Sequence, residues 1–299
     1  MHGTPFSSAG PDRGATALAP LSGATSPATR TAADTALFPM QSDPIPTLRA
    51  GAMLLAAGRG ERMRPLTDRV PKPLLQVQGW PLLHWHLQAL AQAGVAQVLV
   101  NTAWLGTQIS GHFGDTFVPQ PAAGDASGAP LPAVALAYSH EGLDFGAALE
   151  TAGGIARALP QLAPVFWLAA GDVYAPDFTF DPAALHAFAA SDRLAHLWLV
   201  PNPPQHPQGD FGLSPEGLAL NLPASDPAPR YTYSTLALLR AGLFAPPWCD
   251  LPAGNPDGIA APLAPLLRRA MDAGRVSAQI HGGRWTDAGT PERLAALNG

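Results

Sequence analysis

The sequence predicts an α/β fold with a mostly parallel central sheet and helices on both of its faces. From Ala52 onward, short apolar runs alternate with segments in which apolar residues recur every three or four positions. The first pattern is typical of buried parallel strands and the second of amphipathic helices. Repeated strand–helix–strand order implies right-handed crossovers between parallel strands. The chain has 299 residues, 47% of them hydrophobic, and can therefore bury such a sheet.

Apolar runs in the first two thirds of the chain predict strands at residues 52–57, 96–102, 133–139, 163–172 and 194–200. Helical spacing between these runs predicts helices at residues 81–94, 105–113, 149–158 and 182–190. The first helix has Pro81 at its start and Gly94 at its end, where each residue type is favoured. Residues 114–132 are rich in Pro, Gly and Ala, which predicts a loop.

The regular alternation ends after Pro201. After it we expect a hairpin region at residues 202–217, strands at 230–239 and 275–281, and a short strand or turn at 283–289. Helices are expected at residues 261–274 and 290–298. The last helix has Thr290 as its N-cap, Pro291 at its first position and Glu292 in its first turn.

Residues 1–48 are low in complexity, without helical or alternating pattern and without the apolar core of a signal peptide. We expect a disordered tail here, followed by one domain over residues 49–299. A transit peptide is a weaker alternative, because acidic residues interrupt a segment that should be poor in them. Met40 or Met53 is an alternative start of the chain.

Composition excludes several classes of function. Charged residues make up 13% of the chain and the net charge is −5, which argues against a nucleic-acid partner. The single cysteine excludes an internal disulfide framework. No apolar stretch approaches the roughly 20 residues needed to cross a bilayer. We therefore expect a soluble, cytoplasmic protein with no membrane or nucleic-acid partner.

A basic, glycine-containing segment, LLAAGRGERMRPLTDRVPKPLL, spans residues 54–75, directly behind the first predicted strand. Gly58 and Gly60 allow backbone N–H groups to approach an anion, and the arginines add donors. The segment lacks the P-loop pattern, and Met63 occupies the third glycine position of the dinucleotide fingerprint, which disfavours a dehydrogenase. Ligands of such sheets bind at the carboxyl ends of the strands. A polyphosphate site is therefore predicted here.

Lys72 is the one lysine among 17 basic residues, and it lies between Pro71 and Pro73. Exposed cations are largely interchangeable, whereas a tight phosphate or carboxylate site distinguishes a compact ammonium from a guanidinium. The pattern favours a role for Lys72 at the phosphates over survival by chance.

Two carboxylates are candidate metal ligands. Asp172 ends a predicted strand, and Asp287 precedes a glycine turn and the last helix. Each alone has the alternative role of a turn residue or helix cap. Together they suit Mg²⁺, which binds few protein oxygens in addition to substrate phosphates.

Glu150 and Thr151 precede Gly153 and Gly154 at a predicted helix start. The small residues predict a surface on which a base or sugar packs; the alternative is a helix with glycines for packing reasons. The histidines lack metal-ligand spacing.

These motifs resemble those of the sugar-1-phosphate nucleotidyltransferases, whose hallmark is L-A-A-G-x-G-x-R-(M/L)-x-P-x-T followed by P-K-P-L. Here the two motifs span Leu55–Thr67 and Pro71–Leu74, and the likeness extends from Ala52 to the C-terminus. The segments GRGERMRPLTD, NTAWLG, LETAGG, PNPPQHPQGDFGL and WTDAGTPERL are most similar to the bacterial branch that acts on N-acetylmuramate-1-phosphate.

The resemblance implies a Rossmann-like nucleotidyltransferase fold and a set of site residues. Those implied to bind substrate are Leu55, Ala57, Gly58, Arg59, Gly60, Lys72, Glu150, Thr151, Gly153, Asn202 and Asp210. Those implied to act in catalysis are Arg64, Lys72 and Asp172, and those implied to bind Mg²⁺ are Asp172 and Asp287.

The implied reaction is Mg²⁺-dependent transfer of a uridylyl group from UTP to a sugar-1-phosphate, with N-acetylmuramate α-1-phosphate favoured, in peptidoglycan recycling. The products are a UDP-sugar and pyrophosphate. Another pair, such as GTP with mannose-1-phosphate or UTP or dTTP with glucose-1-phosphate, stays an alternative. So does a non-catalytic nucleotide or sugar sensor, although a sensor needs neither both acids nor the lysine. A monomer or small homo-oligomer is expected.

Three features depart from the branch. The segment 114–147 is longer than expected, and Ala170 precedes Gly171–Asp172 where many relatives have Asn. Ala152 replaces a glycine, and its methyl group is expected to crowd a ligand.

Overall fold

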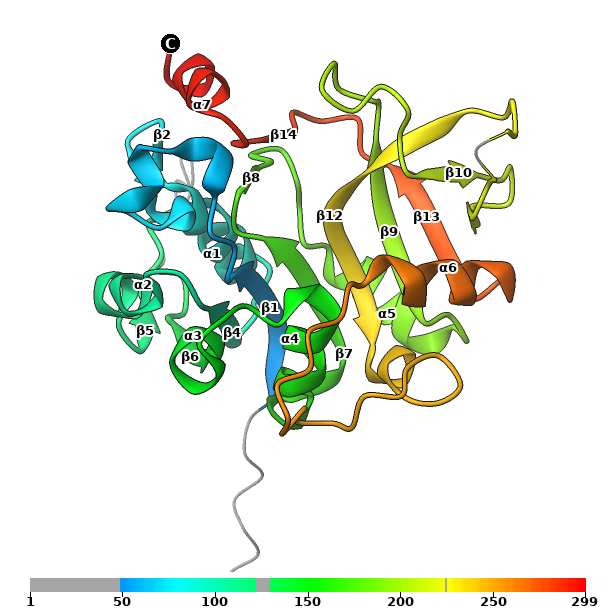
Figure 1. The fold of residues 1–299 in the computed structure, drawn as a ribbon, viewed down its shortest axis with the longest axis horizontal. Helices are drawn as coiled ribbons and strands as arrows, with labels where there is room; N and C mark the ends of the chain where they lie inside the picture. The colour runs from blue at the N-terminus through cyan, green and yellow to red at the C-terminus, as the bar shows by residue number, and fades with distance from the viewer. Residues whose placement is uncertain (1–48, 122–129, 224) are drawn as a thin grey trace, which may run out of the picture. The chain divides into compact units, whose positions relative to one another are not determined.

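The computed structural model describes residues 49–121, 130–223 and 225–299 (Figure 1). The expectations for the tail, residues 1–48, lie outside these ranges. Ten strands form the main sheet: β1 (Ala50–Ala56), β4 (Gln97–Thr102), β5 (Thr116–Phe117), β6 (Val134–His140), β7 (Leu162–Ala170), β9 (Ala195–Val200), β10 (Phe211–Leu213), β11 (Ala219–Leu220), β12 (Arg230–Arg240) and β13 (Val276–Ile280). The helices are α1 (Leu82–Gln92), α2 (Gly106–Phe113), α3 (Glu141–Phe145), α4 (Glu150–Ala158), α5 (Pro182–Ala190), α6 (Ala264–Asp272) and α7 (Pro291–Asn298).

The sheet is mostly parallel, as the sequence predicts. Its order is β11-β10-β12-β7-β1-β4-β6-β5, and β9 pairs with β12 and β13. Strands β7, β1, β4 and β6 are mutually parallel, and β13 is parallel to β9. The long strand β12 runs antiparallel to both β7 and β9 and joins the two parallel blocks. The carboxyl ends of β1 and β7 therefore meet at one edge, directly before the segments expected to carry the site.

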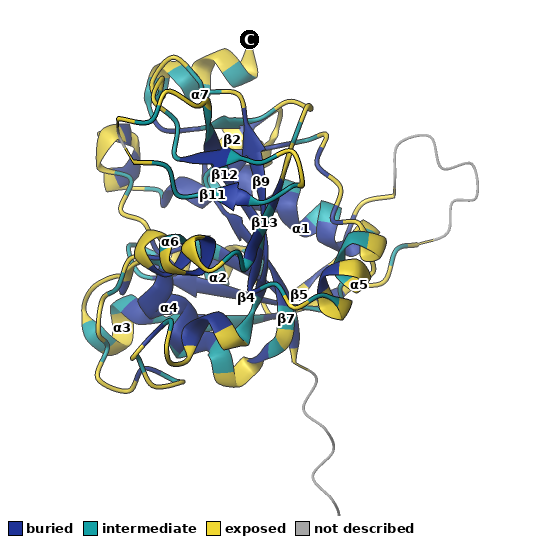
Figure 2. Ribbon diagram, turned by 90° about the vertical axis from the view of Figure 1, so that its right-hand side faces the viewer, coloured by how far each residue is buried: buried dark blue, intermediate teal, exposed yellow. Residues whose placement is uncertain are grey.

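Alternate residues of β1 enter two separate apolar cores on opposite faces of the sheet. Met53 packs in one core with side chains of α4 and α6, such as Ile155 and Leu266. Leu54 packs in the other core with side chains of α1, α2 and α5, such as Leu87. Figure 2 shows the strands as buried and the outer faces of the helices as exposed. Each fully buried Leu or Met stabilises the fold by roughly 1.5–3 kcal/mol.

Several boundaries and small elements differ from the expectations. The strand expected at 163–172 ends at Ala170, so that Gly171 and Asp172 form a turn. The helix expected at 261–274 starts at Ala264, because residue Ala261 pairs through its backbone with the first turn of α4. Helix α3 and the short strand β5 were not expected.

A hairpin of β2 (Gln76–Val77) and β3 (Trp80–Pro81) precedes α1 and was likewise not expected. Its turn residues Gln78 and Gly79 have φ of 51° and 82°, and Asn-Gly rather than Gln-Gly is the usual signal for such a turn. Pro81 consequently lies just outside the helix. Within the described ranges, none of the helices combines the length and apolar character needed to cross a bilayer.

Candidate active site

The glycine-containing segment after β1 folds into a compact loop over Lys72. Gly60 has φ of 65°, and a Cβ at this position would lie 3.0 Å from Thr67 Cγ2 and 3.4 Å from Lys72 Cβ. The Thr67 hydroxyl donates to the Gly60 carbonyl at 2.8 Å. Three 3-10 turns, Glu61–Met63, Leu66–Asp68 and Lys72–Leu74, reverse the chain repeatedly. A side chain at residue 60 would therefore be strained by the positive φ and tightly packed against Thr67.

Lys72 forms an ion pair with Asp172. Its Nζ donates to Asp172 Oδ2 at 2.5 Å, and the Lys72 side chain is 9% exposed, against 39% for Asp172. The pair forms because β1 and β7 are neighbours: the Gly171 N–H donates to the Leu55 carbonyl at 2.8 Å. The lysine and the first of the two predicted metal ligands thus lie together, although 100 positions separate them.

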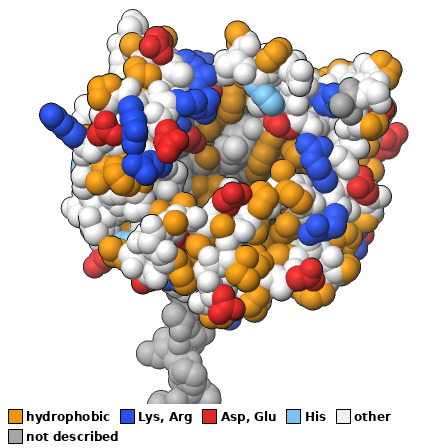
Figure 3. Space-filling view, viewed as in Figure 1, with side chains coloured by type: hydrophobic (Ala, Val, Ile, Leu, Met, Phe, Trp, Pro, Cys, Tyr) orange, Lys and Arg blue, Asp and Glu red, His pale blue; other side chains and the backbone are white. Residues whose placement is uncertain are grey.

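A cleft of about 370 Å³ opens above this pair. It is lined by Leu55, Ala56, Ala57, Gly58, Lys72, Pro73, Asn101, Ala148, Glu150, Thr151, Ala170, Asp172 and Thr235. A second cavity, of about 380 Å³, shares Leu55, Glu150, Thr151 and Thr235 with the cleft and extends along β12 toward α6. Figure 3 shows a hollow on this face, with basic side chains gathered along one rim. The two cavities are therefore neighbours that meet at these four residues.

Two residues shared by both cavities have backbones in the left-handed region. Glu150 has φ of 55° and Thr235 has φ of 63°; for a β-branched residue this conformation is unfavourable. Thr235 lies where the pairing of β12 with β9 is interrupted, and the Trp285 indole donates to the Ser234 carbonyl at 3.0 Å. Strained backbone of this kind collects at ligand sites. Sequence reasoning missed Thr235; the polar pair Ser234–Thr235 within an apolar strand was the available signal.

A buried polar network links the end of β1 to the start of α4. Asn101 Oδ1 accepts from the Ala56 N–H at 2.9 Å, and its Nδ2 donates to Glu141 Oε1 at 2.7 Å. Glu141 Oε2 accepts from the Leu149 N–H at 2.7 Å. Burial raises the pKa of Glu141, while the hydrogen bonds from the Leu149 N–H and the Asn101 amide, with the charge of Arg157, oppose this rise. The network fixes Leu149 and hence the position of Glu150. Sequence reasoning did not identify it.

Glycines 153 and 154 serve this packing rather than lining the cleft. A Cβ on Gly154 would lie 2.4 Å from Glu141 Oε1, and one on Gly153 would lie 2.4 Å from the Ile259 carbonyl. Ala152 is fully buried in the core of α4 and α6, so its methyl group does not crowd either cavity, contrary to the expectation. For Gly153 the structure therefore favours the packing interpretation over the substrate-binding one.

Asp287 lies beside Asp172. Strand β14 (Thr286–Asp287) pairs with β8 (Val173–Tyr174), and the Ala288 N–H donates to the Asp172 carbonyl at 2.9 Å. Asp287 Oδ2 lies 2.9 Å from an Arg293 nitrogen, and its Oδ1 accepts from Gln205 at 2.9 Å. The structure thus brings the backbones of the two expected metal ligands together, with Asp172 in the turn before β8 and Asp287 on β14, while their side chains line different cavities.

Arg62 and Arg64 make different contacts in the loop. Arg62 lines a small cavity of about 240 Å³ together with Asp287. Arg64 pairs with Asp68 at 3.1 Å, with both side chains half exposed. The motif places both arginines in the loop, and spacing alone did not show that their contacts differ.

The other expected substrate residues divide between the cavities and the scaffold. Leu55, Ala57, Gly58 and Thr151 line the cleft, and Asp210 lines the second cavity. Arg59 lies over the Trp104 ring at 4.4 Å, on the outside of the loop. Asn202 accepts from the Thr232 hydroxyl at 3.0 Å and donates to the Arg230 carbonyl at 3.0 Å, and it lines neither cavity. Asn202 thus orders the segment that leads to Asp210.

His86 supports the turn that carries Asp172. Its Nε2 lies 2.9 Å from the Val173 carbonyl oxygen, and burial lowers the pKa of His86 to about 4. The ring is consequently neutral near pH 7, and an N–H of the ring donates to this carbonyl. The histidine acts as a structural support rather than as a metal ligand.

The chain matches a family model described as the MobA-like NTP transferase domain over residues 52–207. It is 45% identical over 245 residues to N-acetylmuramate alpha-1-phosphate uridylyltransferase of Neisseria meningitidis serogroup B, covering 81% of this chain and 94% of that protein. A protein of the same name from Caulobacter vibrioides is 31% identical over 261 residues, covering 82% of this chain and 94% of that protein.

Solved structures show the same fold. A structure assigned to a glucose-1-phosphate thymidylyltransferase of Bacillus anthracis superposes with a TM-score of 0.64 at 18% identity, covering 83% of this chain and 93% of that chain. The inositol-1-phosphate CTP transferase from T. maritima superposes with a TM-score of 0.57 at 18% identity, covering 84% and 96%. The family match and the relatives aligned over most of their length show that the chain belongs to the sugar-1-phosphate nucleotidyltransferases and is an enzyme of that class.

Proposed function

We propose that this enzyme transfers a uridylyl group from UTP to N-acetylmuramate α-1-phosphate, with release of pyrophosphate. The observation that carries the proposal is the Lys72–Asp172 ion pair at the base of a two-part cleft, in a chain similar over most of its length to enzymes named for this reaction. N-acetylmuramate is a sugar of peptidoglycan, so the proposed role is peptidoglycan recycling in the cytoplasm.

The reaction needs no nucleophile from the protein. An oxygen of the sugar phosphate attacks the α-phosphorus of UTP in line, and pyrophosphate leaves, so that catalysis consists of positioning and electrostatic stabilisation. Lys72 places a positive charge at the base of the cleft, where charge develops on the phosphate oxygens. Arg62, which lines a small cavity with Asp287, would hold the leaving pyrophosphate, and Gly58 lets its backbone approach the triphosphate. Glu150 and Thr151 line both the cleft and the second cavity, where the nucleotide and the sugar would meet.

Asp172 and Asp287 are the residues that would hold Mg²⁺. Two carboxylates, one in the turn before β8 at the phosphate cleft and one on the paired strand β14, suit an ion that takes few protein oxygens and completes its coordination with phosphates and water. Within the described residues, no group of three or more His, Cys, Asp or Glu side chains forms a metal cage. When bound, the ion would neutralise negative charge at the reacting phosphate.

The test is pyrophosphate release in the presence of Mg²⁺, with UTP, dTTP, GTP and ATP each crossed with the 1-phosphates of N-acetylmuramate, N-acetylglucosamine, glucose and mannose. We expect release with UTP and N-acetylmuramate-1-phosphate at a kcat/KM above that of every other pair. Preference for another pair would move the substrate assignment while retaining the reaction class. Binding of nucleotide without any release would contradict the proposal and favour a sensor.

A further inference from the structure

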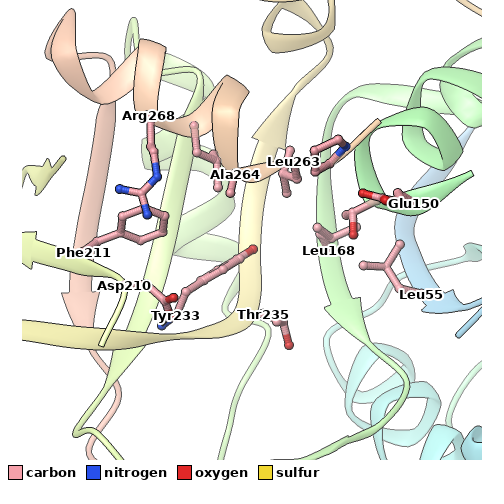
Figure 4. A pocket seen from close by; sticks show the side chains of 13 residues that line it. Leu55, Glu150, Leu168, Asp210, Phe211, Tyr233, Thr235, Leu263, Ala264 and Arg268 are labelled. Carbon is pink, nitrogen blue, oxygen red and sulfur yellow. Dashed lines mark hydrogen bonds between the residues drawn. The ribbon is translucent and has the colours of Figure 1, made fainter. Parts of the chain in front are cut away.

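The second cavity has one basic side chain among the residues that line it, that of Arg268 on α6. Glu150 and Asp210 are the acidic ones. Figure 4 shows Arg268, Asp210 and Tyr233 on one side of the cavity, and Leu55 and Glu150 on the opposite side. Because Leu55 and Glu150 also line the phosphate cleft, a sugar whose phosphate lies in that cleft extends toward Arg268.

The guanidinium of Arg268 is held in place without an acidic partner. It lies over the Phe211 ring at 5.1 Å from the centroid, and Nη1 donates to Asn221 Oδ1 at 2.7 Å. Asn221 is itself oriented by Asp272, whose two carboxylate oxygens accept from Asn221 Nδ2 at 3.0 and 3.2 Å. Among the described residues, no carboxylate oxygen lies within 4.0 Å of an Arg268 nitrogen, which is the limit for an ion pair. The charge is thus positioned by neutral contacts and available to a ligand.

A second polar group in the same cavity also lacks a partner. The hydroxyl oxygen of Tyr233 is buried, and within the described part of the chain it makes no hydrogen bond. Burial, and next the charge of Asp210, raise the pKa of Tyr233 well above its ordinary value, so that the hydroxyl keeps its proton and is a donor. A buried donor without an acceptor costs free energy of folding, and a ligand oxygen removes this cost. Tyr233 therefore marks the cavity as a site for a polar ligand.

We infer that Arg268 binds a carboxylate carried by the sugar substrate and selects the acidic sugar over its neutral counterpart. The inference rests on the proposed function, since N-acetylmuramate differs from N-acetylglucosamine by a lactyl ether that ends in a carboxylate. A guanidinium binds a carboxylate through two parallel hydrogen bonds, with strict geometry. Arg268 also offsets the repulsion that Asp210 and Glu150 exert on a negatively charged sugar.

The experiment compares wild type with Arg268→Gln and Arg269→Gln. Arg269 is the next residue of α6, is exposed and lines neither cavity, so its substitution removes the same charge outside the site. Steady-state kinetics with UTP give kcat/KM for N-acetylmuramate-1-phosphate and for N-acetylglucosamine-1-phosphate. We expect Arg268→Gln to lower the ratio of the two values about ten- to a hundredfold, the scale of one charge-assisted hydrogen-bond pair. We expect Arg269→Gln to leave this ratio at the wild-type value.

Arg268→Lys provides a second test, because it keeps the charge but not the paired geometry. We expect it to restore part of the lost ratio, with the loss appearing in KM for the acidic sugar. The inference would be overturned if Arg268→Gln lowered kcat/KM equally for both sugars, so that the ratio of the two values equalled that of Arg269→Gln. The proposed function would remain intact in that case. A wild-type enzyme that does not use N-acetylmuramate-1-phosphate would instead overturn the proposed function, and the inference with it.

Discussion

The ammonium of Lys72 lies in a place where an isolated charge is costly. Its side chain is 9% exposed, and burying a charge costs several kcal/mol unless an opposite charge offsets it. Asp172 supplies the opposite charge in the free enzyme, and substrate phosphates would share it during the reaction. Because Asp172 is more exposed than Lys72, substrate phosphates can replace it as the partner of the lysine. An ion pair with a purely structural role would not be open to this exchange.

The two arginines of the loop provide a test at the scale of single residues. We expect Arg62→Ala to lower kcat/KM for UTP about ten- to a hundredfold, because a charge-assisted contact to phosphate is lost. We expect Arg64→Ala to change kcat/KM by less than about threefold, because Arg64 forms an exposed pair with Asp68 and such pairs contribute little. Initial rates of pyrophosphate release measure both. Equal losses in the two variants would contradict a role for Arg62 that Arg64 does not share.

Helix α4 shows how one element connects the core to the site. Its second glycine, Gly154, leaves room for the hydrogen bond between Asn101 and Glu141, and this network fixes the backbone before Glu150. The sequence predicted the helix and its small residues, but not the reason for them. Helical periodicity describes a helix relative to itself, whereas the partner of Gly154 comes from β4 and α3.

At this scale we expect Gly154→Ala to lower the free energy of unfolding by about 1–3 kcal/mol, because the added methyl group overpacks the buried network. We expect KM for the sugar phosphate to rise as well, since Glu150 is displaced. Gly111→Ala is the matched control: it lies on an exposed part of α2, and nothing lies within 4 Å of the added Cβ. Alanine there should be neutral or stabilising. Urea unfolding measures both, and an equally small effect would refute the packing role.

For the whole molecule, apolar runs and helical spacing were sufficient to predict a mostly parallel α/β sheet and the edge where its site lies. Gly58 and Asp172 were expected at that edge because each follows a strand, and Lys72 because it is the one lysine and lies between two prolines; all three line the cleft. Thr235 and Glu141 were not singled out, because their positions depend on a strand irregularity and a buried network; Arg62 was expected only as one of several arginine donors in the loop. Arg268 escaped notice because it lies on a helix remote in sequence from every motif.

The pH dependence of stability is a further property of the whole molecule. His86 has a pKa of about 4 in the folded chain against an ordinary value of 6.5. Between these values the unfolded chain binds a proton that the folded chain does not, so stability falls as the pH is lowered. Relative to His86→Gln, which retains a donor for the Val173 carbonyl, the wild type should lose about 2 kcal/mol of unfolding free energy between pH 7 and 4.5. Urea unfolding at both pH values checks this, and parallel losses in the two proteins would show that His86 titrates normally.

The most direct test of the central claim, that the Lys72–Asp172 cleft carries uridylyl transfer, is the formation of UDP-N-acetylmuramate followed by phosphorus NMR in wild type and Lys72→Ala. We expect the variant to remain folded, because Asp172 is left partly exposed, and to form product roughly a hundred- to ten-thousandfold more slowly, the scale of one lost electrostatic contact in the transition state. A folded Lys72→Ala enzyme that forms this product at a near-normal rate would contradict the claim.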